Sequence, residues 1–213
     1  MPRTGLAYCM AAVYNHNPST GVITYSNGGY IGRLVRANIQ KNDNNDNDWY
    51  GDNVVGETDN EFSGGSVELE VGEILIEAAE HFFGLTVAPL TGNDAITGVT
   101  DEGAKKIVYK ASANTPYLGL GTVLTERVKG TGESSYVGVV LTKCQLTPPN
   151  TEATTKGANI DWQNVTVNGS VFRDDQTDPV WKIESSPLST MAQALAFVRH
   201  FLNIPDPAQT PGG

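Results

Sequence analysis

The sequence predicts a mainly β fold with two helices. Most of the chain consists of short runs that alternate apolar and polar residues and are interrupted by Gly, Asn and Pro, which is typical of strands and turns. Only two segments place their apolar residues at helical spacing. With 213 residues and 39% hydrophobic composition, the chain is long enough to bury a substantial core.

The strands are predicted from alternation and from turn composition at their ends. In SVELEV (66–71), Val67, Leu69 and Val71 point to one side of the chain and Glu68 and Glu70 to the other, which predicts a half-buried strand. Four later segments are rich in Val, Leu, Tyr, Trp or Thr and are bounded by turns such as KGTGE and RDDQTD: 117–128, 135–146, 158–163 and 164–172. The run SYVGVVLTKC (135–144) has no clear solvent face, so we expect another copy of the chain to pair with its edge.

The two predicted helices are short and amphipathic. In GEILIEAAEHFF (72–83), Ile74, Ala78 and the pair Phe82 and Phe83 share one helix face, and Gly84 follows as a C-terminal cap. The second helix covers about residues 190–203, and Pro205 follows its end. Its apolar stripe consists of Met191, Leu195, Val198 and Leu202. Both helices are expected to pack against a sheet.

The charge of the chain is unevenly distributed. The net charge is −10, and residues 42–104 contain no Lys or Arg but 15 of the 24 carboxylates. This balance argues against a nucleic-acid backbone as a bound partner, because such binding needs clustered Lys and Arg. It suits self-association between an acidic and a basic face, or a surface that repels DNA, although a merely solvated acidic surface fits as well.

One domain is expected over residues 1–204, followed by a flexible tail over 205–213 (PDPAQTPGG). Cys9 and Cys144 lie in apolar, strand-like runs and are too few for a disulfide framework, so we expect buried free thiols. No charged-then-apolar leader opens the chain, and no apolar run approaches the roughly eighteen residues that a membrane span needs. We therefore expect a soluble protein made in a cytoplasm.

The stretch DNDWYGDNVVGE (46–57) matches the pattern of an EF-hand calcium loop at Asp46, Asp48, Gly51 and Glu57. Tyr50 occupies a position that normally supplies an oxygen ligand, and neither flank has helical sequence, so we do not expect an EF-hand. A weaker cation site on the same carboxylates stays open, because residues 43–52 are dense in oxygen ligands. Its candidate ligands are Asp46, Asp48, Asp52 and Glu57.

No convincing catalytic set is present, and we expect neither enzymatic activity nor a cofactor. Asp161 and Asp174 could form a glycosidase-like pair, but RDDQTD has the composition of a turn. The glycines of GLGTVL, from Gly119, are expected to let a strand pack closely rather than to bind phosphate. A carbohydrate- or cation-binding β-sandwich module, which would use the Asn/Asp cluster with Trp49 and Tyr50, is the alternative function.

Several segments in a fixed order make the chain resemble the major tail proteins, or tail-tube proteins, of long-tailed bacteriophages with flexible, non-contractile tails. In the first half these are GLAY, then WYGDNVVGETDNEFSGGSVELEV, then a helix ending in HFFGLTV. In the second half they are PYLGLGTVLTERVKG, then TKGANIDWQ followed by VNGSVFRDD, and a closing helix after PVWKIESSPLST. The resemblance covers about residues 5–204. The inner-tube protein of a contractile tail, or of a tail-derived particle, is the alternative within this class.

The resemblance implies a β-sandwich or barrel-like tail-tube fold with a short helix after the first hairpin and long hairpins that join neighbouring copies into rings, commonly of six. Stacked rings form a tube in the virion, and DNA passes through its lumen without specific binding. The implied partners are further copies of the chain, a tape-measure protein, and tail-tip and terminator proteins. The resemblance also implies that residues 46–57 form the turn and returning strand of a hairpin.

Two locations for the acidic segment follow from the resemblance. Glu68 and Glu70, on the polar side of their strand, are expected to face the lumen, where they would weakly repel DNA. Alternatively, the segment lies on a stacking face and meets basic residues of the next ring. The candidates for that role are Lys105, Lys106, Lys129 and Arg173.

Overall fold

The computed structural model describes residues 2–43, 48–51, 54–58, 62–91, 95–99, 103–112, 114–128, 130, 132–150 and 164–206, with the backbone alone at 43, 48–51 and 54–58. The strand expected at 158–163 and most of the expected tail lie outside these residues. The fold is mainly β, as predicted. Its elements are β1 (Arg3–Asn17), β2 (Val22–Gly32), β3 (Leu34–Asp43), β4 (Asp48–Gly51), β5 (Val54–Thr58), β6 (Phe62–Val71), α1 (Ile76–Phe83), β7 (Thr86–Pro89), β8 (Lys105–Val108), β9 (Leu118–Arg127), β10 (Ser134–Leu146), β11 (Val165–Phe172), β12 (Lys182–Glu184) and α2 (Met191–Leu202).

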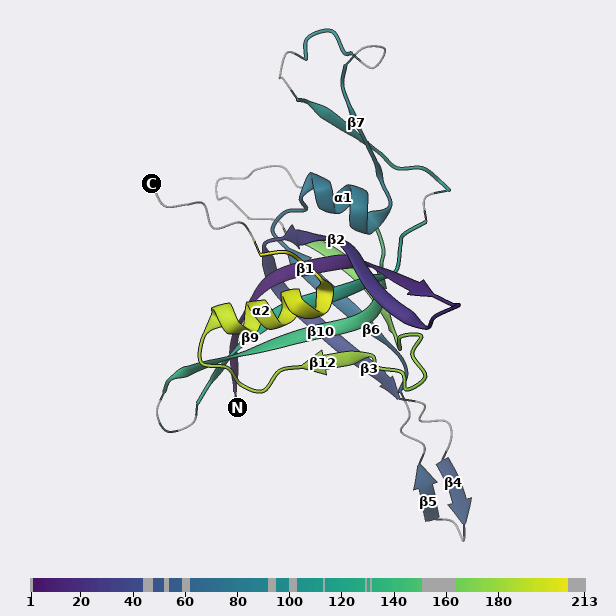
Figure 1. The fold of residues 1–213 in the computed structure, drawn as a ribbon, viewed down its shortest axis with the longest axis vertical. Coiled ribbons are helices and arrows are strands. Elements are labelled where there is room, and N and C mark those ends of the chain that lie inside the picture. Colours follow the sequence, from purple (N-terminus) through teal and green to yellow (C-terminus); the bar gives the residue numbers. More distant parts are fainter. Residues whose placement is uncertain are drawn as a thin grey trace, which may run out of the picture.

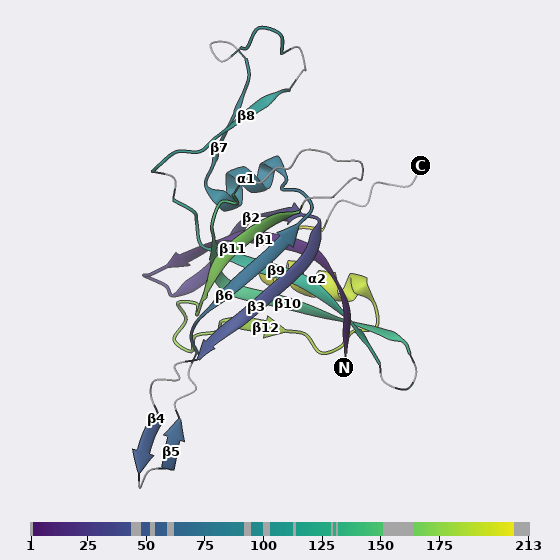
Figure 2. The same ribbon diagram turned by 180° about the vertical axis from the view of Figure 1, so that it is seen from behind.

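One antiparallel sheet dominates the molecule (Figures 1 and 2). Its strand order is β2-β1-β9-β10-β11-β6-β3, and β12 pairs with β10. The long strand β10 connects two halves of the sheet, because its early residues pair with β9 and its last residues, from Lys143 to Leu146, pair with β11. The strands at the two ends of the order, β2 and β3, are separated in sequence by Arg33 alone. The sheet therefore curls back on itself into a β-sandwich, barrel-like core.

The main core lies between the two halves of the sheet. Apolar side chains of β1 and β9 meet those of β6 and β11 there, and α1 closes one end with Phe82 and Phe83. Both cysteines, Cys9 and Cys144, are buried free thiols in this core, as predicted. Burial raises the pKa of the Cys9 thiol to about 12. In the described part of the chain, no helix has the length and apolar character that crossing a membrane requires.

The expectation that another copy pairs with the edge of residues 135–144 is wrong. These residues belong to β10, which lies inside the sheet between β9 on one side and β12 and β11 on the other. The run has no solvent face because both of its faces are covered, and of its ten residues only Tyr136 and Lys143 are partly exposed. One face contributes Leu141 and Cys144 to the main core, and the other contributes Val140 to a second core beneath α2.

Helix α2 covers the outer face of β1, β9 and β10, and its boundaries agree with the sequence prediction. The Thr190 hydroxyl accepts a hydrogen bond from the backbone N–H of Gln193 at 3.3 Å, and Asn203 ends the helix in the left-handed conformation with φ 51°. Ala194, Val198 and Leu202 are fully buried against the sheet.

Glycines in the sheet make the close approach of α2 possible, as the sequence indicated for GLGTVL. A methyl group placed on Gly121 would lie 2.2 Å from Cγ1 of Val198, so Gly121→Ala is expected to push α2 away from the sheet. We expect a loss of about 1–3 kcal/mol in the free energy of unfolding, the usual cost of overpacking. Urea denaturation would measure it. Gly29→Ala is the control, because nothing lies within 4 Å of its added methyl group, and equal losses in both variants would contradict the tight packing at Gly121.

Helix α1 begins at Ile76, four residues later than the predicted start at 72. Two backbone hydrogen bonds explain the difference: the N–H of Gly72 donates to the carbonyl of Arg33 at 2.9 Å, and the N–H of Leu75 donates to that of Ile31 at 3.0 Å. These bonds hold residues 72–75 extended against the corner between β2 and β3. The end of the helix agrees with the prediction, since Gly84 has φ 63°.

Two hairpins stand apart from the main sheet. Strands β4 and β5 form one two-stranded sheet, and β7 and β8 form another, which we call the arm. Both project from the body of the molecule in the two opposite views (Figures 1 and 2). The β4–β5 hairpin lies between strands β3 and β6 in the sequence, so the matching residues of the calcium pattern are flanked by strands and do not form an EF-hand.

Candidate functional site

Strands β3, β6 and β11 expose a polar surface on the side opposite the core. Alternate residues form three cross-strand rows: Arg36, Glu70 and Thr166; Asn38, Glu68 and Asn168; and Gln40, Ser66 and Ser170. We call these nine residues the polar face. It contains two carboxylates, one guanidinium and otherwise neutral hydrogen-bonding groups, and no aromatic or aliphatic side chain.

Glu68 and Glu70 occupy the middle strand of the polar face, on the side of β6 that the sequence predicted. Glu68 forms an ion pair with Arg36 at 3.1 Å and keeps 41% of its side chain exposed. Glu70 accepts a hydrogen bond from the side-chain amide of Asn164 at 2.7 Å. Such exposed ion pairs contribute little to stability, so these carboxylates mainly determine the charge and hydration of the surface.

The polar face ends at an open strand edge. Within the described strands, β3 pairs with β6 alone, so its other edge leaves backbone N–H and C=O groups without a strand partner. An edge of this length is a template for another strand. The inward residues Ala37 and Ile39 anchor β3 to the core, which holds the free edge in place.

The predicted basic candidates do not form one patch. Lys105 and Lys106 lie on β8 in the arm, and the neighbouring Tyr109 shares a pocket with Val165, the first residue of β11. Arg173 follows the other end of β11, eight residues and roughly 26 Å further on. Lys129 lies outside the described residues.

The proposed cation ligands are only partly described. Asp48 and Glu57 lie in β4 and β5 of one hairpin, where the residue pairs are Asp48 with Thr58 and Trp49 with Glu57. Asp46 and Asp52 lie outside the described residues, as does Asp161 of the suggested glycosidase pair. Across the residues that are described, no cluster of three or more His, Cys, Asp or Glu could hold a metal ion.

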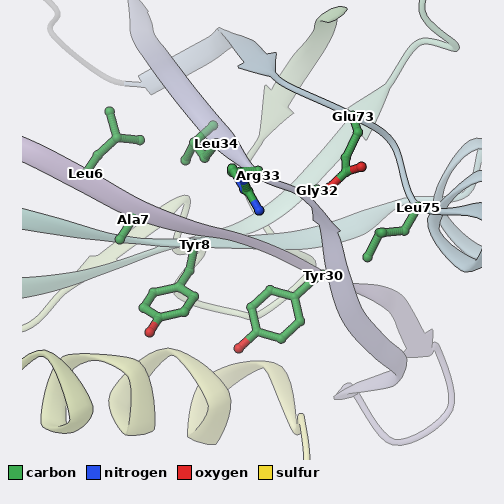
Figure 3. Close-up of a pocket in the computed structure, with 9 residues that line it drawn as sticks. All are labelled: Leu6, Ala7, Tyr8, Tyr30, Gly32, Arg33, Leu34, Glu73 and Leu75. Atoms are coloured by element: carbon green, nitrogen blue, oxygen red, sulfur yellow. The ribbon is translucent and has the colours of Figure 1, made fainter. Parts of the chain in front are cut away.

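An open groove of about 470 Å³ lies where the two ends of the sheet meet (Figure 3). One wall is the first half of β1, with Leu6, Ala7 and Tyr8; the other is the β2–β3 corner, and Glu73 and Leu75 close one end. The lining is mainly apolar. This groove could not be predicted from the sequence, because its walls come from three separate segments.

Two tyrosines shape the side of the groove nearest to α2. Tyr8 has φ 62° at an irregularity in β1, and its ring lies 5.9 Å from that of Tyr30, centroid to centroid. Arg199 of α2 donates a hydrogen bond from Nη2 to the Tyr30 hydroxyl at 3.1 Å and pairs with Asp206 at 2.7 Å. Figure 3 shows both tyrosine rings pointing toward α2, which agrees with the hydrogen bond between Arg199 and Tyr30.

Asp174 and Asp175 each hold separate parts of the chain together through hydrogen bonds. Asp174 is buried, and its two oxygens accept hydrogen bonds from the backbone of Gln176 and Val180 and from the Gln176 side chain. Asp175 binds Lys143 at 2.6 Å and the Tyr14 hydroxyl at 2.8 Å. The hydrogen bond from Lys143 is the main cause that lowers the pKa of Asp175. The composition of RDDQTD predicted the turn but not these partners.

A scan against protein-family models found no match, and a search of curated proteins found no significant match either.

Proposed function

We propose that this chain is the tail-tube subunit of a long-tailed bacteriophage, a structural virion protein without enzymatic activity. In this role copies assemble into rings, the rings stack into a tube, and DNA passes through the lumen. The ordered segments shared with tail-tube proteins support the proposal. The structural observation that carries it is the polar face ending at the open edge of β3.

An open edge beside a polar face suits a subunit that continues its sheet into a neighbour. A strand of a second copy can pair with β3 and satisfy its free backbone groups. The polar faces of successive copies then form one continuous surface with a slight excess of carboxylates. Such a surface repels the DNA backbone weakly and offers neither clustered cations nor aromatic platforms for bases. Glu68 and Glu70 line the lumen in this arrangement, and a tube structure that buries both between subunits would contradict it.

The role implies synthesis in the host cytoplasm, location in the phage tail, and contacts with tape-measure, tail-tip and terminator proteins. It also implies that the chain needs no cofactor. The proposed function implies these partners in addition to the other copies of the chain.

Negative-stain electron microscopy of the concentrated, purified chain, with and without calcium, tests the proposal. We expect stacked rings or tubes with a regular axial repeat in both conditions, because the proposed contacts need no metal. A monomer at every concentration, with a calcium-dependent rise in melting temperature or saturable carbohydrate binding, would instead support the binding module.

A further inference from the structure

The arm presents one face that its own chain leaves exposed. Lys105, Ile107 and Tyr109 alternate along β8 and just past its end, so they point to the same side of the strand, and Lys110 follows. Ile107 is 38% exposed and Tyr109 61% exposed, although both also border a pocket of about 270 Å³ against α1. An apolar centre with charges at its margin is the usual composition of a protein interface. We call these four residues the arm face.

A second exposed surface, of opposite charge, lies on the outer side of α1. Leu75, which also lines the groove, is 38% exposed, and Ile76 is 42% exposed. Glu77 and Glu80 share the exposed side of α1 with Ile76, and Glu73 lies at the end of the groove. The α1 face consists of Glu73, Leu75, Ile76, Glu77 and Glu80.

These two surfaces complement each other in both chemistry and charge. Each carries two partly exposed large apolar residues, and the lysines of one match the glutamates of the other. The groove beside Leu75 extends the apolar area of the α1 face, and Arg33 is the one basic residue among those that line it. Within the described residues, no ion pair engages the three glutamates.

We propose that the arm face of one copy binds the α1 face of a second copy, with Tyr109 entering the groove beside Leu75. Lys105 and Lys110 then face the glutamates of α1. The inference rests on the proposed self-assembly and names the surfaces of one of its contacts.

A second copy is the occupant that fits both surfaces. In the single chain the arm face and the α1 face are exposed at the same time, so the arm does not cover the α1 face of its own chain. The arm also projects away from the body of the molecule in both views (Figures 1 and 2). A contact between two different surfaces is heterologous, and repeated contacts of this kind close into a ring or grow into a filament.

Charge reversal on each surface tests the contact. The variant Glu73→Lys/Glu77→Lys changes the α1 face, Lys105→Glu/Lys110→Glu changes the arm face, and a fourfold variant combines both. Light scattering and sedimentation velocity give the protein concentration at which half of the chains are assembled. We expect each double variant to raise this concentration at least about tenfold, which corresponds to about 1.4 kcal/mol. The fourfold variant should recover to within about threefold of the unaltered chain, because its charges are again complementary.

Two further variants separate the contact from general effects of charge. Asp178→Lys reverses an exposed acid in another loop and should leave assembly unchanged. Tyr109→Ala removes the apolar centre of the arm face and should weaken assembly as much as the double variants do. Far-UV circular dichroism confirms that each variant remains folded.

The outcomes distinguish this inference from the proposed function. If the unaltered chain assembles and neither charge reversal changes its assembly, the arm contact is wrong and the tail-tube function stands. If both reversals weaken assembly but the fourfold variant does not recover, the two faces do not meet and the inference is likewise overturned. An unaltered chain that stays monomeric at every concentration would overturn both proposals.

Discussion

Replacement of Phe83 by alanine is expected to lower the free energy of unfolding by about 3–5 kcal/mol. Phe83 is fully buried where α1 closes the end of the main core. The helix has only eight residues, and no side chain caps its start, so packing rather than intrinsic helix propensity stabilises it. The last turn of α1 buries two aromatic rings, Phe82 and Phe83, and the substitution removes one of them. Urea denaturation followed by circular dichroism measures the loss.

Glu80→Ala is the matched control for this variant. Glu80 lies in the same helix with its side chain exposed, so the substitution should change the free energy of unfolding by no more than about 0.5 kcal/mol. A small loss in both variants would mean that α1 is not needed to close the core. A large loss in both would mean that the whole helix tolerates no substitution, and burial of Phe83 would no longer explain the result.

Local sequence patterns predicted the elements whose boundaries depend on local chemistry. The predicted ends of α2 agree with the structure because its capping residues, Thr190 and Asn203, form their capping hydrogen bonds with nearby residues of the same helix. The strands at 117–128, 135–146 and 164–172 correspond to β9, β10 and β11, since alternation and turn residues mark their ends. The start of α1 was wrong because residues distant in sequence, Ile31 and Arg33, accept the hydrogen bonds of Leu75 and Gly72.

Features that depend on strand register could not be predicted. Alternation assigned Glu68 and Glu70 to the polar side of β6, but nothing local indicated that Arg36 and Asn38 of β3 lie beside them. The arm was not anticipated, because β7 and β8 have four residues each and are separated by fifteen residues. The lack of a clear solvent face in β10 suggested that another copy pairs with its edge, whereas β9, β11 and β12 of the same chain pair with it and its two faces are covered by the main core and by α2.

Two adjacent residues of the same type can also have different structural roles that the sequence does not distinguish. Asp174 and Asp175 both belong to a segment with turn composition, yet Asp174 is 5% exposed and organises the turn, whereas Asp175 joins Lys143 and Tyr14. Only the folded chain brings these partners together, since Tyr14 is 161 residues from Asp175.

Asp174→Ala is expected to lower the free energy of unfolding by about 3 kcal/mol, because the buried carboxylate accepts three hydrogen bonds. The side chain accepts a hydrogen bond from the backbone N–H of Val180 at 2.9 Å, another from that of Gln176 at 3.3 Å, and a third from the Gln176 side chain at 3.0 Å. A hydrogen bond to a charged group contributes about 1.5–3 kcal/mol, and bonds within one network do not add fully. Thermal and urea denaturation would measure the loss.

The same substitution should also loosen the strand that follows the turn. The carbonyl of Val180 accepts a hydrogen bond from the hydroxyl of Thr142, and the next carbonyl, of Trp181, accepts one from the backbone of Thr142, which aligns β12 with β10. Amide exchange in β12 should therefore accelerate in Asp174→Ala. Asp178→Ala is the control, because Asp178 is exposed in the same turn. If both variants lose equal stability, composition of the turn rather than the buried carboxylate determines its conformation. If Asp174→Ala alone unfolds more easily while β12 keeps its exchange protection, the carboxylate stabilises the turn without aligning the strand.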